Sequence, residues 1–374
     1  MTRAIAVLVL FALLGCVEAH AQPLADLVRD LNAMQNRMVA GDLPARDQAA
    51  RQFDLIEKEI GGGDDASWME ERHARAAIIY LLCGGASGGL RSLAKDKRFN
   101  EALSPLLSAS LLYADGDPRA RDALMAFDAR AYPAVLGGHL ALVQGGALVG
   151  TDNSRAIALL DLARLLMPGS LVEEAALRRE ISALDPVRDE EKIGLLAIRY
   201  ATKYASSPFA RHFWELFPNI ALAATALPPS RVDLVLAKAP HAERLDFYLA
   251  LSRRSLLEGN FGEADAALKK VEKIVLDPPQ GKRLAAYRAV LSVLRDDQGA
   301  AALRGLDLTG LTSEDAGVVK LAASVGAKLE KALAADSPVS EAGEAPNDDT
   351  YDVEDNVRKA LAQTDELLKR ANRR

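Results

Sequence analysis

Cysteine and aromatic residues are scarce in this chain, and each scarcity excludes a class of protein. Two cysteines, Cys16 and Cys83, occur in 374 residues, so a framework of several disulfides, typical of small secreted domains, is excluded. Aromatic residues make up 5% of the chain, and the alternation of β-branched residues that marks strands is almost absent, which excludes an all-β fold. Alanine and leucine dominate instead and predict an all-α protein.

Charge and hydropathy exclude two further classes. The formal net charge is −6, whereas a nucleic-acid partner requires a basic face, so we expect no nucleic-acid partner. Beyond the first 21 residues, no apolar run reaches the length of a transmembrane helix. The sequence therefore predicts no transmembrane anchor.

The first 21 residues have the pattern of an export signal. Arg3 provides a positive start, residues 4–14 form an unbroken apolar run, and the AHA tripeptide that ends at Ala21 provides small residues for signal peptidase. The apolar run is too short to be a stable membrane anchor. The pattern predicts a signal peptide over 1–21, cleaved after Ala21, and a periplasmic mature protein.

A rival processing site overlaps this leader. Leu13, Leu14, Gly15 and Cys16 resemble the lipobox of bacterial lipoproteins, in which the cysteine is acylated. Leucine directly before the glycine is less usual than alanine or serine, which favours the cut after Ala21. A lipid anchor at Cys16 stays open as the alternative.

The remaining cysteine, Cys83, lies at the end of the apolar run AAIIYLLCG. Once the leader is removed it has no cysteine to pair with, so the mature chain forms no internal disulfide. A lone thiol in such a run usually packs as a small hydrophobic group. A nucleophilic role would need a base, and the sequence places no plausible one near it.

Periodic apolar runs predict helices along almost the whole mature chain, and glycine and proline clusters mark most of the connections between them. The predicted helices lie near 24–39, 45–60, 68–83, 99–113, 118–129, 133–149, 153–167, 171–184, 188–205, 208–225, 241–258, 261–275, 280–296 and 313–335.

Three of these helix pairs have a tetratricopeptide-like pattern. Gly116 and Gly150 each close a helix, precede a second helix, and lie 34 residues apart, which is the tetratricopeptide period. Residues 256–279 repeat the pattern around Gly259. The sequence therefore predicts a TPR-like α-solenoid of stacked hairpins over 22–335 whose concave surface binds a partner. Any antiparallel helix pair with a short glycine turn fits the same pattern.

The composition changes after Ala335. Residues 336–350 are acidic and rich in Pro, Gly and Ser, which predicts a disordered linker. Residues 351–374 predict an amphipathic helix with acids early and bases late. Such a helix either docks back on the body of the protein or is carried for a partner.

Two motifs suggest catalysis or metal binding, but the residues around each motif do not support that function. Residues 85–89 (GASGG) match the G-x-S-x-G nucleophile elbow with Ser87 at its centre, but that elbow requires a parallel sheet, so we predict a flexible interhelical loop. Glu70 and His73 have the spacing of di-iron bundle ligands, which need a second such motif. We expect no catalytic residue, no cofactor and no metal.

The other charged candidates also have ordinary interpretations. His139, His212 and His241 are scattered, without the paired spacing that places two metal ligands on one helix face. Glu173 and Glu174 precede Arg178 and Arg179, and the spacing of Glu174 and Arg178 predicts an i, i+4 ion pair on a solvated helix face. No candidate points to a small-molecule substrate.

Two segments carry a resemblance to a known family. Residues 161–179 (DLARLLMPGSLVEEAALRR) and 200–217 (YATKYASSPFARHFWELF) resemble the MotC family of periplasmic motility proteins. In that family a helix ending in Leu-Pro-Gly, or a close variant, leads into a Leu-Val-Glu-Glu-Ala-Ala-Leu-Arg-Arg helix, and an aromatic-Ser-Pro-aromatic-Ala segment opens a later helix. The likeness extends from the leader to about residue 300.

The resemblance implies a periplasmic accessory of the flagellar motor that supports chemotaxis and flagellar rotation. MotC proteins are associated with MotB, the stator subunit whose periplasmic part anchors to peptidoglycan. The implied role is to bind that part and stabilise or position it without catalysis, and we expect the contact on the concave face of the middle hairpins. The alternative is a periplasmic or lipid-anchored TPR-like scaffold in cell-envelope assembly.

Overall fold

The computed structural model describes most of the predicted helical region. The described residues are 23–62, 67–223, 227–272, 277–293, 303 and 305–335. The predicted signal peptide with Cys16, the predicted linker 336–350 and the predicted final helix 351–374 lie outside them.

The predicted all-α class is confirmed, since the described residues form helices joined by turns and contain no strand. In chain order the α-helices are α1 (Leu24–Val39), α2 (Pro44–Gly62), α3 (Glu71–Leu82), α4 (Gly88–Lys95), α5 (Ser104–Ala114), α6 (Ala120–Met125), α7 (Ala134–Leu148), α8 (Asn153–Leu166), α9 (Leu171–Ala183), α10 (Glu190–Tyr204), α11 (Ala210–Ala223), α12 (Pro229–Leu236), α13 (His241–Leu257), α14 (Phe261–Val271), α15 (Pro278–Val293) and α17 (Ser313–Ala335), with the short 3₁₀ helices η1 (Ser67–Met69) and η2 (Ala129–Ala131).

Two helices were missed by the sequence prediction. α4 begins at Gly88 and Gly89, so the predicted interhelical loop over 85–89 is wrong at its last two residues. The glycines lower the local helix propensity, but Leu90 and Leu93 are buried and hold the helix in place. α12 begins at Pro229, directly after another proline, where a helix start and a loop share the same sequence signal.

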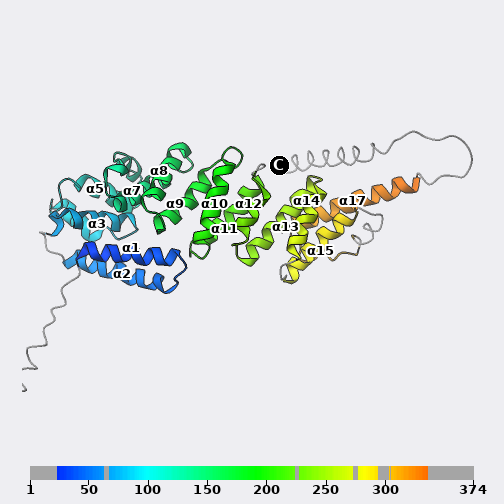
Figure 1. Ribbon diagram of the computed structural model, residues 1–374, viewed down its shortest axis with the longest axis horizontal. Coiled ribbons are helices and arrows are strands. Elements are labelled where there is room, and N and C mark those ends of the chain that lie inside the picture. Colours follow the sequence, from blue (N-terminus) through cyan, green and yellow to red (C-terminus); the bar gives the residue numbers. More distant parts are fainter. Residues whose placement is uncertain are drawn as a thin grey trace, which may run out of the picture. The chain divides into compact units, whose positions relative to one another are not determined.

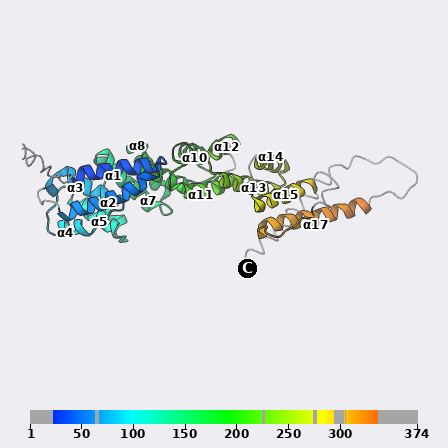
Figure 2. The same ribbon diagram turned by 90° about the horizontal axis from the view of Figure 1, so that it is seen from below.

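The described chain consists of two compact units, one up to Lys238 and one from Ala239. In the first unit α1 pairs with α2 and α7 pairs with α8, while α9 contacts α7, α8 and α10 (Figure 1). In the second unit α13 pairs with α14, and α15 and α17 pack against that pair and against each other, as both views show (Figures 1 and 2). Each unit buries apolar faces of neighbouring hairpins, as stacked helical arrays do.

The turn glycines behave as predicted. Gly116 and Gly150 have φ angles of 68° and 83°, and Gly259 has 76°. This left-handed backbone ends a helix at little steric cost only for glycine. It therefore lets the chain reverse between α5 and α6, α7 and α8, and α13 and α14.

The apolar spacing of Leu140, Val143, Ala147 and Leu148 predicts one buried face of α7. Leu140, Val143 and Leu148 are buried, but Ala147 is exposed. On α8 the same spacing allows Ala163 or Arg164 at one core position, and Ala163 fills it. Residues on several faces of α7 are buried because this helix packs against α3, α8 and α9.

Helix α1 lies across other helices of the first unit and not only against α2. It contacts α3 and α9, its Asn32 Oδ1 lies 3.2 Å from His139 Nε2 on α7, and its Asn36 Oδ1 accepts a hydrogen bond from Leu171 N at 3.0 Å. α1 therefore covers one side of α3, α7 and the start of α9.

Candidate functional site: the buried polar junction around helix α9

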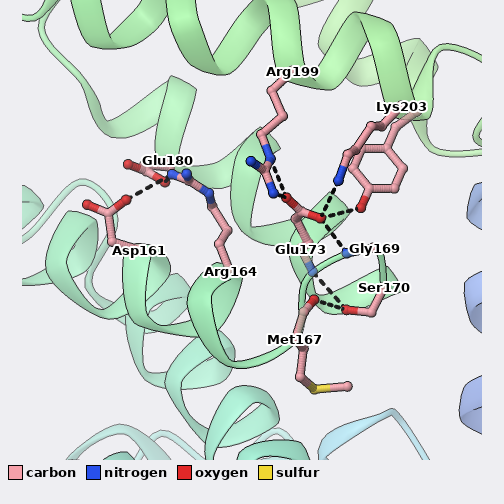
Figure 3. A network of polar contacts seen from close by, with 10 residues as sticks. Asp161, Arg164, Met167, Gly169, Ser170, Glu173, Glu180, Arg199 and Lys203 are labelled. Atoms are coloured by element: carbon pink, nitrogen blue, oxygen red, sulfur yellow. Dashed lines mark hydrogen bonds and ion pairs between the residues drawn. The ribbon is translucent and has the colours of Figure 1, made fainter.

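Helix α9 begins with a capping box. Ser170 Oγ accepts a hydrogen bond from Glu173 N at 3.2 Å, and Glu173 Oε2 accepts one from Gly169 N at 2.5 Å (Figure 3). Ser170 Oγ also donates to Met167 O at the end of α8. These contacts satisfy backbone groups that a helix start leaves unpaired, and they fix the angle at which α9 leaves α8.

Glu173 is fully buried and joins α9 to α10. Its carboxylate accepts a hydrogen bond from Tyr204 Oη at 2.8 Å, pairs with Arg199, and lies 3.6 Å from Lys203 Nζ (Figure 3). Burial raises the pKa of Glu173, but the hydrogen bonds from Gly169, Tyr204 and Arg199 outweigh burial and leave the pKa below its usual value. The carboxylate is therefore ionised at neutral pH.

Glu174 is equally buried, so the predicted solvated face is wrong, although the predicted ion pair with Arg178 forms at 2.8 Å. Glu174 Oε1 also accepts hydrogen bonds from Tyr200 Oη at 2.6 Å and Ser207 Oγ at 3.4 Å. Arg178 in turn lies over the ring of Phe209, 5.6 Å from its centroid. The other two partners of Glu174, Tyr200 and Ser207, lie 26 and 33 residues away in sequence. Helix periodicity cannot predict contacts with them.

A third buried carboxylate, Glu180, joins α8 to α10. It pairs with Arg164 at 2.6 Å and Lys192 at 2.7 Å, and Asp161 contacts the same two cations at 2.8 Å and 2.6 Å. Burial raises the pKa of Glu180 despite the opposing hydrogen bonds from Lys192 and Arg164. An open pocket of about 450 Å³ beside this network is lined by Asp161, Arg164, Lys192, Leu195, Leu196, Ile198 and Arg199.

Aromatic rings continue the junction into α11. The ring of Tyr200 stacks on Phe213 with centroids 4.2 Å apart, and Phe213 contacts Trp214 at 4.7 Å and Phe217 at 5.6 Å. Together with Glu174, these residues bring the two segments 161–179 and 200–217 into direct contact. The two parts of the sequence that carry the family resemblance therefore form one packed junction.

We define the polar junction as the three carboxylates Glu173, Glu174 and Glu180 with their partners. Each carboxylate is held by cations, and Glu173 and Glu174 also by tyrosine hydroxyls. Burial and the neighbouring carboxylates raise the pKa values of Tyr200 and Tyr204 well above the usual tyrosine value. The tyrosines therefore stay protonated and donate hydrogen bonds to Glu173 and Glu174, which joins α9 to α10.

The nucleophile-elbow candidate lies at the surface, away from this junction. Ser87 precedes α4 and donates a hydrogen bond to Asp115 Oδ1 at 2.6 Å, and Arg91 pairs with the same carboxylate. The preceding helix α3 replaces the strand that an elbow needs. Ser87 therefore belongs to a polar contact between α4 and the end of α5.

A histidine does lie next to Cys83, contrary to the sequence prediction. Cys83 Sγ lies 3.5 Å from His139 Nδ1, and His139 Nε2 lies 3.2 Å from Asn32 Oδ1. Burial raises the pKa of the Cys83 thiol to about 12 and lowers that of His139 to about 4. Both groups are neutral near pH 7, so the thiol is not activated as a nucleophile. The two residues are 56 positions apart, so local sequence patterns could not predict this contact.

The remaining candidates for metal binding do not converge. His73 is buried, 3.8 Å from Glu70 Oε2, while His212 and His241 are exposed. Across the described ranges, no three His, Cys, Asp or Glu side chains are placed to hold a metal ion. Among these same residues, no helix is long and apolar enough to cross a membrane.

The fold and the junction define an all-helical protein of packed hairpins in which buried ion pairs join neighbouring helices. The chain matches the model of the MotC family, "Chemotaxis protein MotC", over residues 1–373. It belongs to the MotC family and is a chemotaxis- or motility-related protein.

A relative supports this assignment. The chain is 27% identical over 324 residues to "Chemotaxis protein MotC" of Rhizobium meliloti (strain 1021), and the alignment covers 83% of this chain and 73% of the relative. No solved structure matches this chain. The predicted family is thus confirmed over nearly the whole sequence.

Proposed function

We propose that this protein is a non-catalytic accessory of the flagellar motor that binds the periplasmic part of MotB and stabilises or positions it. The observation that carries this proposal is membership of the MotC family. The all-helical array supports it, because stacked hairpins bind proteins along their helices. The packing of the two resemblance segments into one junction further suggests that the junction holds that binding array together.

The proposed location is the periplasm. The leader pattern over residues 1–21 supports export with cleavage after Ala21. Residues 336–350 and 351–374 would follow the helical array as a linker and an amphipathic helix. That final helix is a second place at which a partner could bind.

The proposed contact face consists of α5, α7 and α9, the first helices of their hairpins. α1 covers the side of α7 near His139 and the start of α9 near Leu171. The later turns of α7 and α9 lie beyond those two contacts. We therefore place the MotB contact on the C-terminal halves of α7 and α9, with the neighbouring end of α5.

Calorimetry tests the proposal directly. The mature chain, residues 22–374, is titrated with the purified periplasmic part of MotB from the same organism at about 50 and 300 mM salt. Saturable one-to-one binding is expected, and Glu215→Ala should leave it unchanged because Glu215 forms an exposed ion pair on α11, outside the proposed face. Absence of heat at protein concentrations on the order of 100 μM contradicts the proposal.

The Leu13–Cys16 lipobox favours a second candidate, a lipid-anchored TPR-like scaffold in cell-envelope assembly. Membrane fractionation of the wild type and Cys16→Ser separates the two. Membrane association that depends on Cys16, together with normal swimming in a deletion strain, supports the scaffold. A processed chain that begins at Gln22 contradicts it.

A further inference from the structure

Arg179 differs from the neighbouring arginines Arg164, Arg178 and Arg199 because no carboxylate forms an ion pair with it. No described residue forms a hydrogen bond or ion pair with its guanidinium. Its neighbour Arg178 pairs with Glu174, Arg164 pairs with Asp161 and Glu180, and Arg199 pairs with Glu173. Two adjacent arginines therefore share one nearby carboxylate, and one positive charge remains uncompensated.

The position of this charge is unfavourable in the isolated chain. Arg179 is half-buried, and burial lowers the pKa of its guanidinium, with the charge of Arg178 acting in the same direction. A partly desolvated cation without an ionic partner destabilises a fold or contributes nothing to it. Its presence is explained more simply by a partner than by the stability of the free protein.

The surroundings leave the guanidinium open to a partner. Its Cδ, Cζ and Nε atoms lie 3.5 Å from the place where a β-carbon of Gly146 would stand, so the side chain lies over the backbone of α7. Tyr113, at the end of α5 in the same unit, is 36% exposed, and its electrostatic interaction with Arg179 raises the pKa of the guanidinium against the effect of burial.

We propose that Arg179, laid over Gly146, is the anchor of a protein interface and receives a carboxylate side chain of the partner. The proposal rests on the proposed function in taking the periplasmic part of MotB as that partner. A guanidinium binds a carboxylate through two parallel hydrogen bonds, which a lysine cannot reproduce. Arginine and tyrosine are also the residue types that dominate binding energy at protein interfaces.

The test compares Arg179→Met with Arg155→Met, a matched change of an exposed arginine on α8. Three quantities are measured for each full mature chain: the Tm, the calorimetric Kd for the MotB periplasmic part at two salt concentrations, and the swimming halo of a complemented deletion strain. For Arg179→Met we expect an unchanged or higher Tm, about a tenfold higher Kd with a weaker salt dependence, and a smaller halo. Arg155→Met should leave all three unchanged.

The outcomes separate this inference from the proposed function. If the wild type binds MotB and Arg179→Met binds and swims equally well, the anchor is wrong while the proposed function stands. If the wild type does not bind MotB, the MotB proposal fails, and the swimming halo of Arg179→Met tests the anchor. A smaller halo with an unchanged Tm supports a carboxylate anchor for another motility protein. A normal halo overturns the anchor.

A structural role for Arg179 predicts a lower Tm for Arg179→Met. In that case Arg179→Lys, which keeps the charge and the apolar stem, decides the question. A folded Arg179→Lys chain with wild-type Kd and halo overturns the anchor, whereas weakened binding at wild-type Tm supports it.

Discussion

The two units of the chain bury a carboxylate in the first turn of a helix in the same way. In the first unit Ser170 caps α9 and Glu173 is held by Tyr204 and Arg199. In the second, Thr312 Oγ1 accepts a hydrogen bond from Asp315 N at 3.1 Å at the start of α17, and the fully buried Asp315 is held by other helices.

The partners of Asp315 repeat the same chemistry. Tyr287 donates a hydrogen bond to its carboxylate, and Arg283 pairs with it at 3.0 Å, both from α15. A hydroxyl cap, an acid three residues later, and a tyrosine and an arginine from a packed helix thus recur in both units. The acid lies at the positive end of the helix dipole, so each unit can bury it there while a neighbouring helix supplies the counter-charge.

The difference lies in how many carboxylates each junction contains. Among its described residues the second unit has one such acid, Asp315, whereas α9 carries Glu173, Glu174 and Glu180 within eight positions, all fully buried. The α9 junction links three consecutive helices, α8, α9 and α10, through three carboxylates, whereas the single carboxylate of Asp315 on α17 pairs with arginines of α13 and α15. The comparison indicates that both units join helices through a buried, capped acid, and that α9, within residues 161–179 that resemble the MotC family, carries two further acids.

The largest effect is expected from Glu174→Ala. This change leaves Arg178, Tyr200 and Ser207 without their common acceptor inside the junction, and the free energy of unfolding of the first unit should fall by about 3–5 kcal/mol. Urea denaturation measures it. Glu215→Ala is the matched control, because Glu215 forms the same i, i+4 pair with Arg211 at the surface, where the loss should stay below about 0.5 kcal/mol. Equal losses would show that burial of the α9 pair is unimportant.

The second unit should respond to Asp315→Ala with a smaller loss, about 2–3 kcal/mol. The change removes the acceptor for Tyr287 and a carboxylate that pairs with Arg283 and Arg253. The loss is smaller because each arginine keeps a second acidic partner, Asp246 for Arg283 and Glu314 for Arg253. Hydrogen exchange, which follows opening segment by segment, should report the loss in α15 and α17. If hydrogen exchange in α9 and α10 increased as much as in α15 and α17, the junctions of the two units would not be independent.

Removing the caps should have a similar and modest effect in both units. Ser170→Ala and Thr312→Ala each remove the side chain that accepts a hydrogen bond from the first turn, which costs about 1 kcal/mol of stability. Urea denaturation at neutral pH provides the measurement, with Ser182→Ala near the end of α9 as a control. A loss at one cap and none at the other would break the parallel between α9 and α17.

The smallest effect is expected in acid. The pKa of Glu173 is lower in the folded chain than its ordinary value of 4.5, so the stability from its ionised form is present above that value and is lost as the pH falls through the lower folded pKa. Glu173→Gln should therefore be less sensitive to acid than the wild type below about pH 4.5 in urea denaturation. An identical pH dependence in the two proteins would exclude Glu173 as a source of acid sensitivity.

Local sequence signals predicted the helical architecture well. The bounds of α17 match the predicted 313–335, and the left-handed turns at Gly116 and Gly150 follow from residue type alone. Apolar periodicity and glycine punctuation are local, and hairpins formed by neighbours in sequence leave such patterns in each segment.

The polar junction could be predicted only at its capping box. Ser170 and Glu173 have the S-x-x-E spacing that marks a helix start, but burial of Glu174 depends on Tyr200 and Ser207 from a later helix and loop. The contact between Cys83 and His139 could not be predicted for the same reason. Because an acid without a partner is almost never buried, sequence analysis predicts that a charged helix face is solvated unless its distant partners are known.

The central claim, that the α9 junction holds the array that binds MotB, is tested most directly by calorimetry with three chains: the wild type, Glu174→Ala and Glu215→Ala. The account predicts saturable one-to-one binding of MotB's periplasmic part by the wild type and Glu215→Ala, and loss of binding by Glu174→Ala as its first unit opens. Wild-type affinity in a Glu174→Ala chain whose first unit has opened, or no binding by any of the three, would contradict it.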